Sequence, residues 1–191
     1  MPDRSKYSIL LLLIILFSGC TGNRQKYLHT CDIQPPENKA QTNAFWEKVE
    51  SLQDDLAALN QGTDLIEARE LAETAIGYSI FLTEEYQVVR PAVLHNVLIR
   101  IGLRNRGLCY HWTEDLICRL QALDLKTFQL RWGVAHRGSD LREHNSVVIT
   151  ARGQAFDEGI VLDPWRNSGD LYWARIKTDR YPWQELPPEQ W

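Results

Sequence analysis

The sequence lacks the features that mark several large classes of protein. It has no block of lysine and arginine, and its 21 basic residues are outnumbered by 25 acidic ones, giving a formal net charge of −4 at pH 7. Nucleic-acid binding needs a concentrated positive surface, so we predict no nucleic-acid partner. The four cysteines and five histidines include no Cys-x-x-Cys or His-x-x-x-His pair, which argues against a structural zinc site. We therefore predict no metal and no cofactor.

Long apolar runs are also scarce, and the longest lies at residues 9–17, after a short basic region. It is too short for a permanent membrane-spanning helix and is typical of a signal peptide, which we assign to residues 1–19. Its end, LFSGC, resembles a bacterial lipobox, which implies cleavage before Cys20 and lipidation of that thiol. We expect a lipoprotein of the cell envelope with a membrane anchor at Cys20, at the periplasmic face of the outer membrane in a Gram-negative cell. The alternative is an ordinary secretory signal with a coincidental cysteine.

The rest of the chain divides into a tether and one domain. Residues 20–43 are polar and without sustained periodicity, which indicates a linker, whereas residues 44–191 can form one domain with a hydrophobic core. Lipidation of one cysteine leaves three in an oxidising compartment, so we expect at least one thiol outside any internal disulfide. A bridge between Cys31 and Cys118 remains an open alternative.

Helical periodicity predicts the first elements of the domain. Apolar residues recur at helical spacing over residues 44–60 and again from 65 to about 81, with Asp64 and Glu67 placed to form a capping box between the two helices. Pro91 then begins a short helix that ends near residue 102. We interpret His95 on this helix as a hydrogen-bonded residue without a catalytic role.

A further helix is predicted from Cys109 to about residue 123. It places the Cys109 thiol at a helix N-terminus, where the unpaired N–H groups and the helix dipole favour a thiolate. Cys109 is therefore a candidate nucleophile, and the competing interpretation is a small buried cysteine. His111 should be directed away from Cys109 and is expected at the surface or in a supporting position.

Alternating apolar residues predict four extended segments, at residues 128–134, 144–152, 155–163 and 171–176. Gly153-Gln154 is suited to a two-residue hairpin between the second and third of them. In that register His144 and Asp163 lie directly opposite each other. A turn at residues 157–159 is the alternative and would shift this pairing. The aromatic C-terminal tail is expected to pack over the domain surface.

Three of these residues have the chemistry of thiol-based acyl transfer. Cys109 would be the nucleophile, His144 the general base and acid, and Asp163 the group that orients the imidazole. Their segments, GLCYHWTEDL, EHNSVVIT and GIVLDPWR, occur in the order typical of the transglutaminase-like branch of the papain-like cysteine enzymes, which the chain resembles over residues 104–166.

The resemblance implies an α+β fold of the papain-like (transglutaminase-like) type, with N-terminal helices and the nucleophile helix packed on a small antiparallel sheet. It also implies a catalytic triad in a hydrolase (cysteine peptidase or amidase) or an acyl transferase. The substrate would be a peptide or protein of the cell envelope. Such enzymes need a second donor for the oxyanion, and no motif identifies it here. Gln87, Asn96 and Trp112 carry suitable N–H groups.

Two other functions are compatible with the same residues. One is a non-catalytic module that keeps the fold and binds an envelope partner. The other is a zinc site formed by the cysteine, the histidine and the aspartate of the predicted triad. Arg166, which follows the Asp-Pro-Trp segment, is expected to pair with a carboxylate of the protein or of a substrate.

Overall fold

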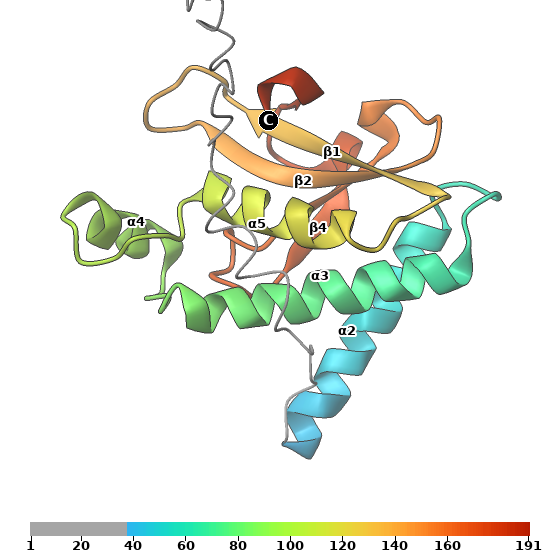
Figure 1. Ribbon diagram of the computed structural model, residues 1–191, viewed down its shortest axis with the longest axis horizontal. Helices are drawn as coiled ribbons and strands as arrows, with labels where there is room; N and C mark the ends of the chain where they lie inside the picture. The colour runs from blue at the N-terminus through green and yellow to red at the C-terminus, as the bar shows by residue number, and fades with distance from the viewer. Residues whose placement is uncertain (1–37) are drawn as a thin grey trace, which may run out of the picture. The chain divides into compact units, whose positions relative to one another are not determined.

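A computed structural model of the chain describes residues 38–191, which form four helices and a five-stranded antiparallel sheet (Figure 1). The helices are α2 (Lys39–Ala57), α3 (Leu65–Glu85), α4 (Ala92–Arg100) and α5 (Cys109–Gln121). The strands are β1 (Phe128–Ala135), β2 (His144–Ala151), β3 (Ile160–Asp163), β4 (Tyr172–Arg175) and β5 (Trp183–Leu186), in the spatial order β4-β3-β2-β1-β5. The predicted α+β class is confirmed.

The predicted signal peptide, the lipobox with Cys20, and Cys31 all lie outside the described residues. None of the described helices is long and apolar enough to cross a membrane. The first helix starts earlier than predicted: α2 begins at Lys39, inside the expected tether, because the Asn38 side chain accepts a hydrogen bond from the Ala40 N–H and caps it.

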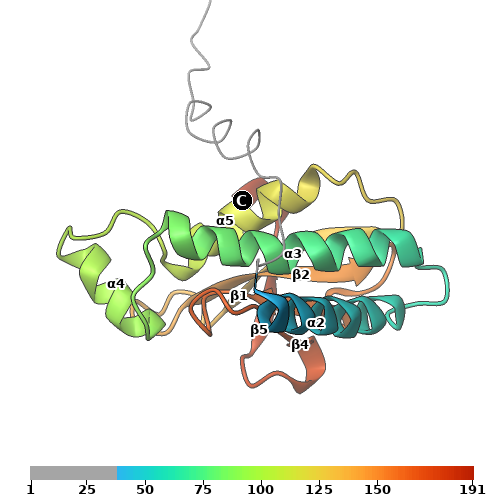
Figure 2. The same cartoon turned by 90° about the horizontal axis from the view of Figure 1, so that it is seen from below.

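The helices α2 and α3 pack against each other, and α3 also contacts α5 (Figures 1 and 2). Four apolar side chains of α2 are buried at helical spacing: Phe45, Val49, Leu52 and Leu56. The α5 helix lies on β2, so the helix that begins at Cys109 rests directly on the centre of the sheet. This contact fixes the position and orientation of the α5 N-terminus relative to β2, the strand that begins at His144.

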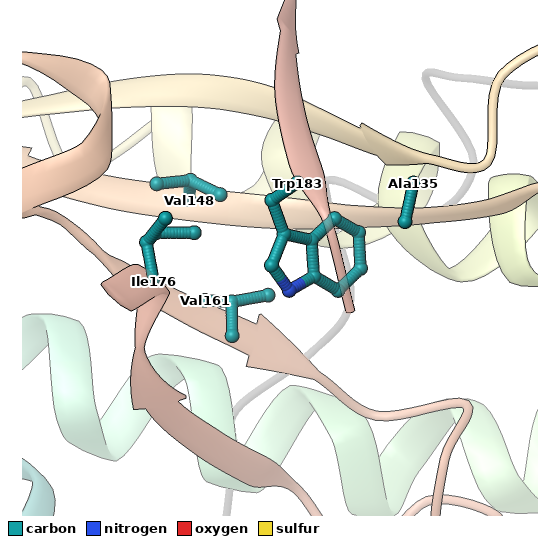
Figure 3. Packing of buried hydrophobic residues seen from close by; sticks show 5 residues of the cluster. All are labelled: Ala135, Val148, Val161, Ile176 and Trp183. Carbon is teal, nitrogen blue, oxygen red and sulfur yellow. The ribbon is translucent and has the colours of Figure 1, made fainter. Parts of the chain in front are cut away.

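Side chains on the opposite face of the sheet form a second cluster. Figure 3 shows its members, which are Ala135, Val148, Val161, Ile176 and Trp183. Val148 and Val161 belong to the two central strands, whereas Trp183 comes from β5 and covers them. Because strand side chains alternate between faces, the neighbouring residues of β2 and β3 are turned toward the helices. The central strands are therefore buried on both sides.

The sheet has one more strand than the sequence predicted. The aromatic tail was expected only to cover the surface, but β5 pairs antiparallel with β1, with Trp183 opposite Ala135 and Leu186 opposite Trp132. The segment is short, and the proline beside it weakens any strand pattern in the sequence. Its position depends on the free edge of β1, a feature that only the folded sheet supplies.

The predicted capping box is half right. The Asp64 side chain accepts hydrogen bonds from the backbone N–H groups of Ile66 and Glu67, as an N-cap does. The Glu67 carboxylate instead accepts from the backbone N–H groups of Lys126 and Thr127 and from the Thr127 hydroxyl. Glu67 therefore fastens the start of α3 to the loop that enters β1, a contact between segments far apart in sequence.

The pairing of β2 with β3 differs from the predicted hairpin. Val147 lies opposite Leu162, whereas the predicted register places it opposite Ile160, two residues away. The connection is also longer than a two-residue turn at Gly153-Gln154, because it includes a 3-10 turn at Phe156–Glu158. That turn comes before Gly159, and the observed register differs from the predicted one by two residues.

An even displacement has a simple consequence. Side chains alternate with a period of two, so a shift of two residues leaves each side chain on its predicted face. In the observed register Asp163 falls opposite Ser146, and His144 is its diagonal neighbour on the same face. Diagonal neighbours are about 7–8 Å apart, within reach of a long side chain such as histidine. His144 and Asp163 therefore lie close together, as predicted, although the two strands pair in a different register.

Candidate active site

Cys109 is the first residue of α5, as predicted, and its thiol is half-buried at the edge of a cleft of about 280 Å³. Two groups on either side of His144 approach the sulfur: the Glu143 carbonyl oxygen, just before β2, and the Asn145 Nδ2 atom each lie 3.9 Å from Sγ. His144, between these residues, also lines the cleft. The structure therefore brings the thiol and the imidazole to one opening.

The His144 ring is hydrogen-bonded to Asp163, with 2.7 Å between Nε2 and Oδ2. The two side chains are 3% and 0% exposed, so their charges are almost fully removed from water. Burial disfavours the charged imidazolium, but the hydrogen bonds with Asp163 and Cys109 and their negative charges outweigh it and raise the pKa of His144 to about 9. Because Nε2 is engaged by Asp163, Nδ1 is the atom left for Cys109.

Arg166 links the Asp163 carboxylate to a second carboxylate, that of Asp179. Arg166 donates to Asp163 from its backbone N–H and from Nε, and its two terminal nitrogens donate to the two oxygens of Asp179 at 2.8 and 2.7 Å. Although burial opposes its charge, the hydrogen bonds from Arg166 and Trp183 hold the pKa of Asp179 below its usual value. The partners of Arg166 are thus carboxylates of the protein, the first of the two predicted possibilities.

Aromatic rings enclose the imidazole. The ring centroid of His144 lies 4.8 Å from that of Trp165, 5.0 Å from Tyr181 and 5.4 Å from Trp183. Trp165 follows the Asp163-Pro164 turn, while the other two rings belong to the C-terminal tail. These rings exclude water from the His144–Asp163 hydrogen bond and hold the imidazole plane, which strengthens the electrostatic interaction between the two residues.

The loop before Cys109 is held in place by His95. Its Nδ1 accepts from the Val89 N–H, its Nε2 is 2.9 Å from the Arg106 carbonyl oxygen, and the ring is 1% exposed. Gly107 lies so close to this ring that an added Cβ would be 2.3 Å from Nε2, and its φ of +120° also favours glycine. The interpretation of His95 as a hydrogen-bonded residue without a catalytic role agrees with these contacts, which position the loop that leads into the nucleophile.

His111 is buried and acts as the cap of α5, which is the supporting position and not the surface position of the two that the sequence suggested. Its Nδ1 atom accepts hydrogen bonds from the backbone N–H groups of Gly107 and Leu108, each at 3.2 Å. Burial disfavours the charged ring and the Arg106 cation adds repulsion, so the pKa of His111 is lowered to about 4. A neutral imidazole at the third helical position does here what glutamate or glutamine does in a capping box.

The cap predicts a loss of stability in mild acid. An unfolded histidine takes up a proton near pH 6.5, whereas folded His111 resists it until about pH 4. The contribution of His111 is therefore fully present above pH 6.5 and is lost as the pH falls from 6.5 to 4. His111→Gln keeps an acceptor that does not titrate, so its free energy of unfolding should fall less between pH 7 and pH 4.5. Urea denaturation at both pH values measures this, and an equal fall in the two proteins would contradict it.

The three suggested oxyanion donors differ in where they lie and in whether their N–H groups are already engaged. The Trp112 ring is 1% exposed and its Nε1 donates to the Gly107 carbonyl at 2.9 Å, so this N–H is already engaged. Gln87 is exposed and does not line the cleft. Asn96 does line it, and its Oδ1 accepts from Trp165 Nε1 at 3.1 Å. Of the three, only Asn96 lies with Cys109.

Sequence reasoning missed two further residues near Cys109, one that lines the cleft and one that contacts the thiol. His136 borders the cleft, and its Nε2 is 3.3 Å from an Arg142 nitrogen. Asn145, directly after His144, has its amide nitrogen beside the thiol. The only signal for Asn145 was an amide side chain directly after the histidine, at the start of the strand.

Comparisons with known proteins add no relative to this picture. No family model, no curated protein and no solved structure matches the chain. Within residues 38–191 no three His, Cys, Asp or Glu side chains are grouped so that they could hold a metal ion. The chemistry of the site therefore rests on the arrangement of Cys109, His144 and Asp163 itself.

Proposed function

We propose that the protein is a cysteine enzyme that attacks the carbonyl carbon of an amide or peptide bond with the thiolate of Cys109. One observation carries the proposal: His144 is hydrogen-bonded to Asp163 through Nε2 and lines the same cleft as Cys109, whose sulfur contributes to the raised pKa of His144. A histidine that is protonated at neutral pH and lies between a cysteine and a carboxylate favours the thiolate, which is the nucleophilic form of the cysteine.

The proposed reaction has two steps. In the first, the Cys109 sulfur bonds to the carbonyl carbon, and the oxyanion that forms then collapses and breaks the C–N bond. The His144 imidazolium gives its proton to the leaving nitrogen, which departs as an amine and leaves a thioester on Cys109. In the second step His144 takes a proton from water or from an amine, which attacks the thioester, so that the acyl group leaves as an acid or an amide and the thiolate and the imidazolium are restored. Water gives a hydrolase, and an amine gives an acyl transferase.

The proposal includes the papain-like, transglutaminase-like fold. Its support is the sequence of elements at the site: a cysteine that opens a helix, a histidine that opens the next but one strand, and an aspartate that ends the strand after it. The remaining element of that resemblance is an antiparallel sheet with the nucleophile helix packed on its centre. A non-catalytic module would place no demand on His144, and its contacts with both neighbours therefore favour the enzyme.

The N-terminal sequence is the basis for proposing where the substrate is found. The apolar run and the LFSGC segment support a lipoprotein anchored at Cys20. An enzyme held there would meet peptides and proteins of the cell envelope. Cleft-lining residues of both polar and apolar type, among them Leu141, Arg142 and Tyr181, suit a peptide more than a purely apolar acyl chain.

Capture of the thioester tests the proposal. The full chain is incubated with p-nitrophenyl acetate, an activated ester that needs no specific groove, and acetylated cysteine is located by fragment mass spectrometry. We expect rapid acetylation at Cys109, slow acetylation at Cys118 on the same helix, and none at position 109 in Cys109→Ala. Equal rates at the two cysteines would mean that Cys109 is not an activated nucleophile and would overturn the proposal.

A further inference from the structure

The side-chain amide of Asn145 has a fixed orientation at the site. Its Oδ1 accepts a hydrogen bond from Trp132 Nε1 at 2.8 Å, and its Nδ2 lies 3.9 Å from the Cys109 sulfur. An indole N–H can only donate, so it must face the amide oxygen, and the amide cannot be reversed without losing this bond. The N–H groups of Asn145 are thereby turned toward the nucleophile.

Trp132 is itself held firmly in the sheet. It lies on β1, its side chain is almost fully buried, and in the β1–β2 register it pairs with Val147, two residues beyond Asn145. The Trp132–Asn145 contact is therefore a diagonal pair between neighbouring strands. A donor mounted on the sheet in this way is positioned before any substrate arrives, which is the requirement for stabilising charge that develops in a transition state.

The distance to sulfur fits a donor for the oxyanion. In a tetrahedral adduct the oxyanion is two bonds from Sγ, and effective donors lie about 2.7–3.1 Å from that oxygen. A nitrogen 3.9 Å from the sulfur can meet this range when the oxygen points to its side. The backbone N–H of Cys109 belongs to the first turn of α5, where N–H groups have no partner within the helix. The two donors would converge on one oxygen.

We infer that Asn145 is the second oxyanion donor of the site, acting with the Cys109 backbone N–H; the inference rests on the proposed acyl-transfer function. As the Cys109 sulfur bonds to the carbonyl carbon, the π electron pair moves to the oxygen, and Asn145 Nδ2 donates a hydrogen bond to it. When the C=O bond reforms, the bond to the leaving group breaks and the hydrogen bond weakens. Trp132 is the positioning residue, because it acts only through Asn145.

Two reagents separate this role from others. Acetylation by p-nitrophenyl acetate passes through an oxyanion, whereas alkylation by iodoacetamide displaces iodide at a saturated carbon and forms none. Both rates are measured at Cys109 of the full chain for the unsubstituted protein, Asn145→Ala, Asn145→Leu and Trp132→Phe. Loss of one oxyanion donor typically costs about 10²- to 10³-fold in rate. We expect a loss of about 100-fold in acetylation for both Asn145 variants and a change below about threefold in alkylation.

Trp132→Phe keeps the ring but removes the N–H that orients the amide. We expect it to slow acetylation by less than the Asn145 variants do and to leave alkylation unchanged. Acetylation within about twofold of the unsubstituted protein in both Asn145 variants would overturn the assignment. An equal fall in both rates would also overturn it, because Asn145 would then support the thiolate or the fold. Slow alkylation and slow acetylation of Cys109 in the unsubstituted protein would instead refute the proposed function.

Discussion

Replacing His144 with alanine is expected to slow the alkylation of Cys109 by iodoacetamide at pH 6 on the order of 10- to 100-fold. Without the imidazolium, Cys109 loses the positive charge beside it that favours the thiolate, which is the form that reacts with iodoacetamide. The thiolate released from its ion pair is intrinsically more nucleophilic, and this offsets part of the loss. Alkylation at Cys109, resolved by fragment mass spectrometry of the full chain, measures the rate.

The chain offers a matched control for this prediction. His136→Ala removes a different histidine of the same cleft, whose ring contacts Arg142 instead of Cys109. It should leave the rate at Cys109 within about twofold, and the rate at Cys118 should be unaffected by either substitution. If His136→Ala and His144→Ala slowed Cys109 equally, the effect would come from the cleft in general and the specific role of His144 would be wrong.

Replacing Arg166 with methionine is expected to cause the largest loss of stability, about 3–5 kcal/mol. The Arg166 side chain is 9% exposed and its guanidinium bonds both Asp163 and Asp179, whose side chains are 0% and 1% exposed. Methionine is similar in size but leaves two buried carboxylates without their shared cation. For a domain of this size such a loss lowers the melting temperature on the order of 10 °C, which thermal denaturation followed by circular dichroism measures.

Two further variants show whether charge is the cause. Adding Asp179→Asn to Arg166→Met removes one of the orphaned charges and should recover part of the lost stability. Arg69→Met breaks an exposed pair with Glu73 on α3 and should cost less than about 0.5 kcal/mol. Equal losses for Arg166→Met and Arg69→Met would show that the Asp163–Arg166–Asp179 network contributes little to stability.

The residues of the site were predictable because their local patterns are strong. The glycine turn before Cys109 and the helical spacing after it locate the α5 N-terminus, which begins at the predicted residue. His144 and Asp163 each mark the end of an extended run, and the structure joins them at 2.7 Å. The predicted register of β2 with β3 was wrong by two residues. His144 and Asp163 still lie on the same face, because side chains alternate along a strand with a period of two.

What could not be predicted depends on contacts between distant segments. Glu67 has the sequence position of a capping residue but binds residues 126–127, because the loop into β1 offers it several donors. His111 caps its own helix, a task for which histidine is rarely chosen. The pairing of β5 with β1 and the approach of Asn145 to Cys109 both require the assembled sheet.

His144 and His111 should act on stability in opposite directions. His144 has a raised pKa of about 9, so its contribution is fully present below the unfolded value near 6.5 and is lost as the pH rises through 9. His111, with its lowered pKa, loses its contribution toward acid instead. The contributions of the two histidines to stability are therefore greatest together near neutral pH.

The protonation state of His144 tests most directly the claim that Cys109, His144 and Asp163 act as one unit. Nitrogen NMR of the His144 ring, assigned by comparison with His144→Ala, reports it from pH 5 to pH 10. We predict a doubly protonated ring at pH 7 that loses its proton near pH 9, and a lower pKa of His144 in Cys109→Ala, where the interaction with the sulfur is absent. A neutral ring at pH 7, titrating near the usual pKa of about 6.5, would contradict the account.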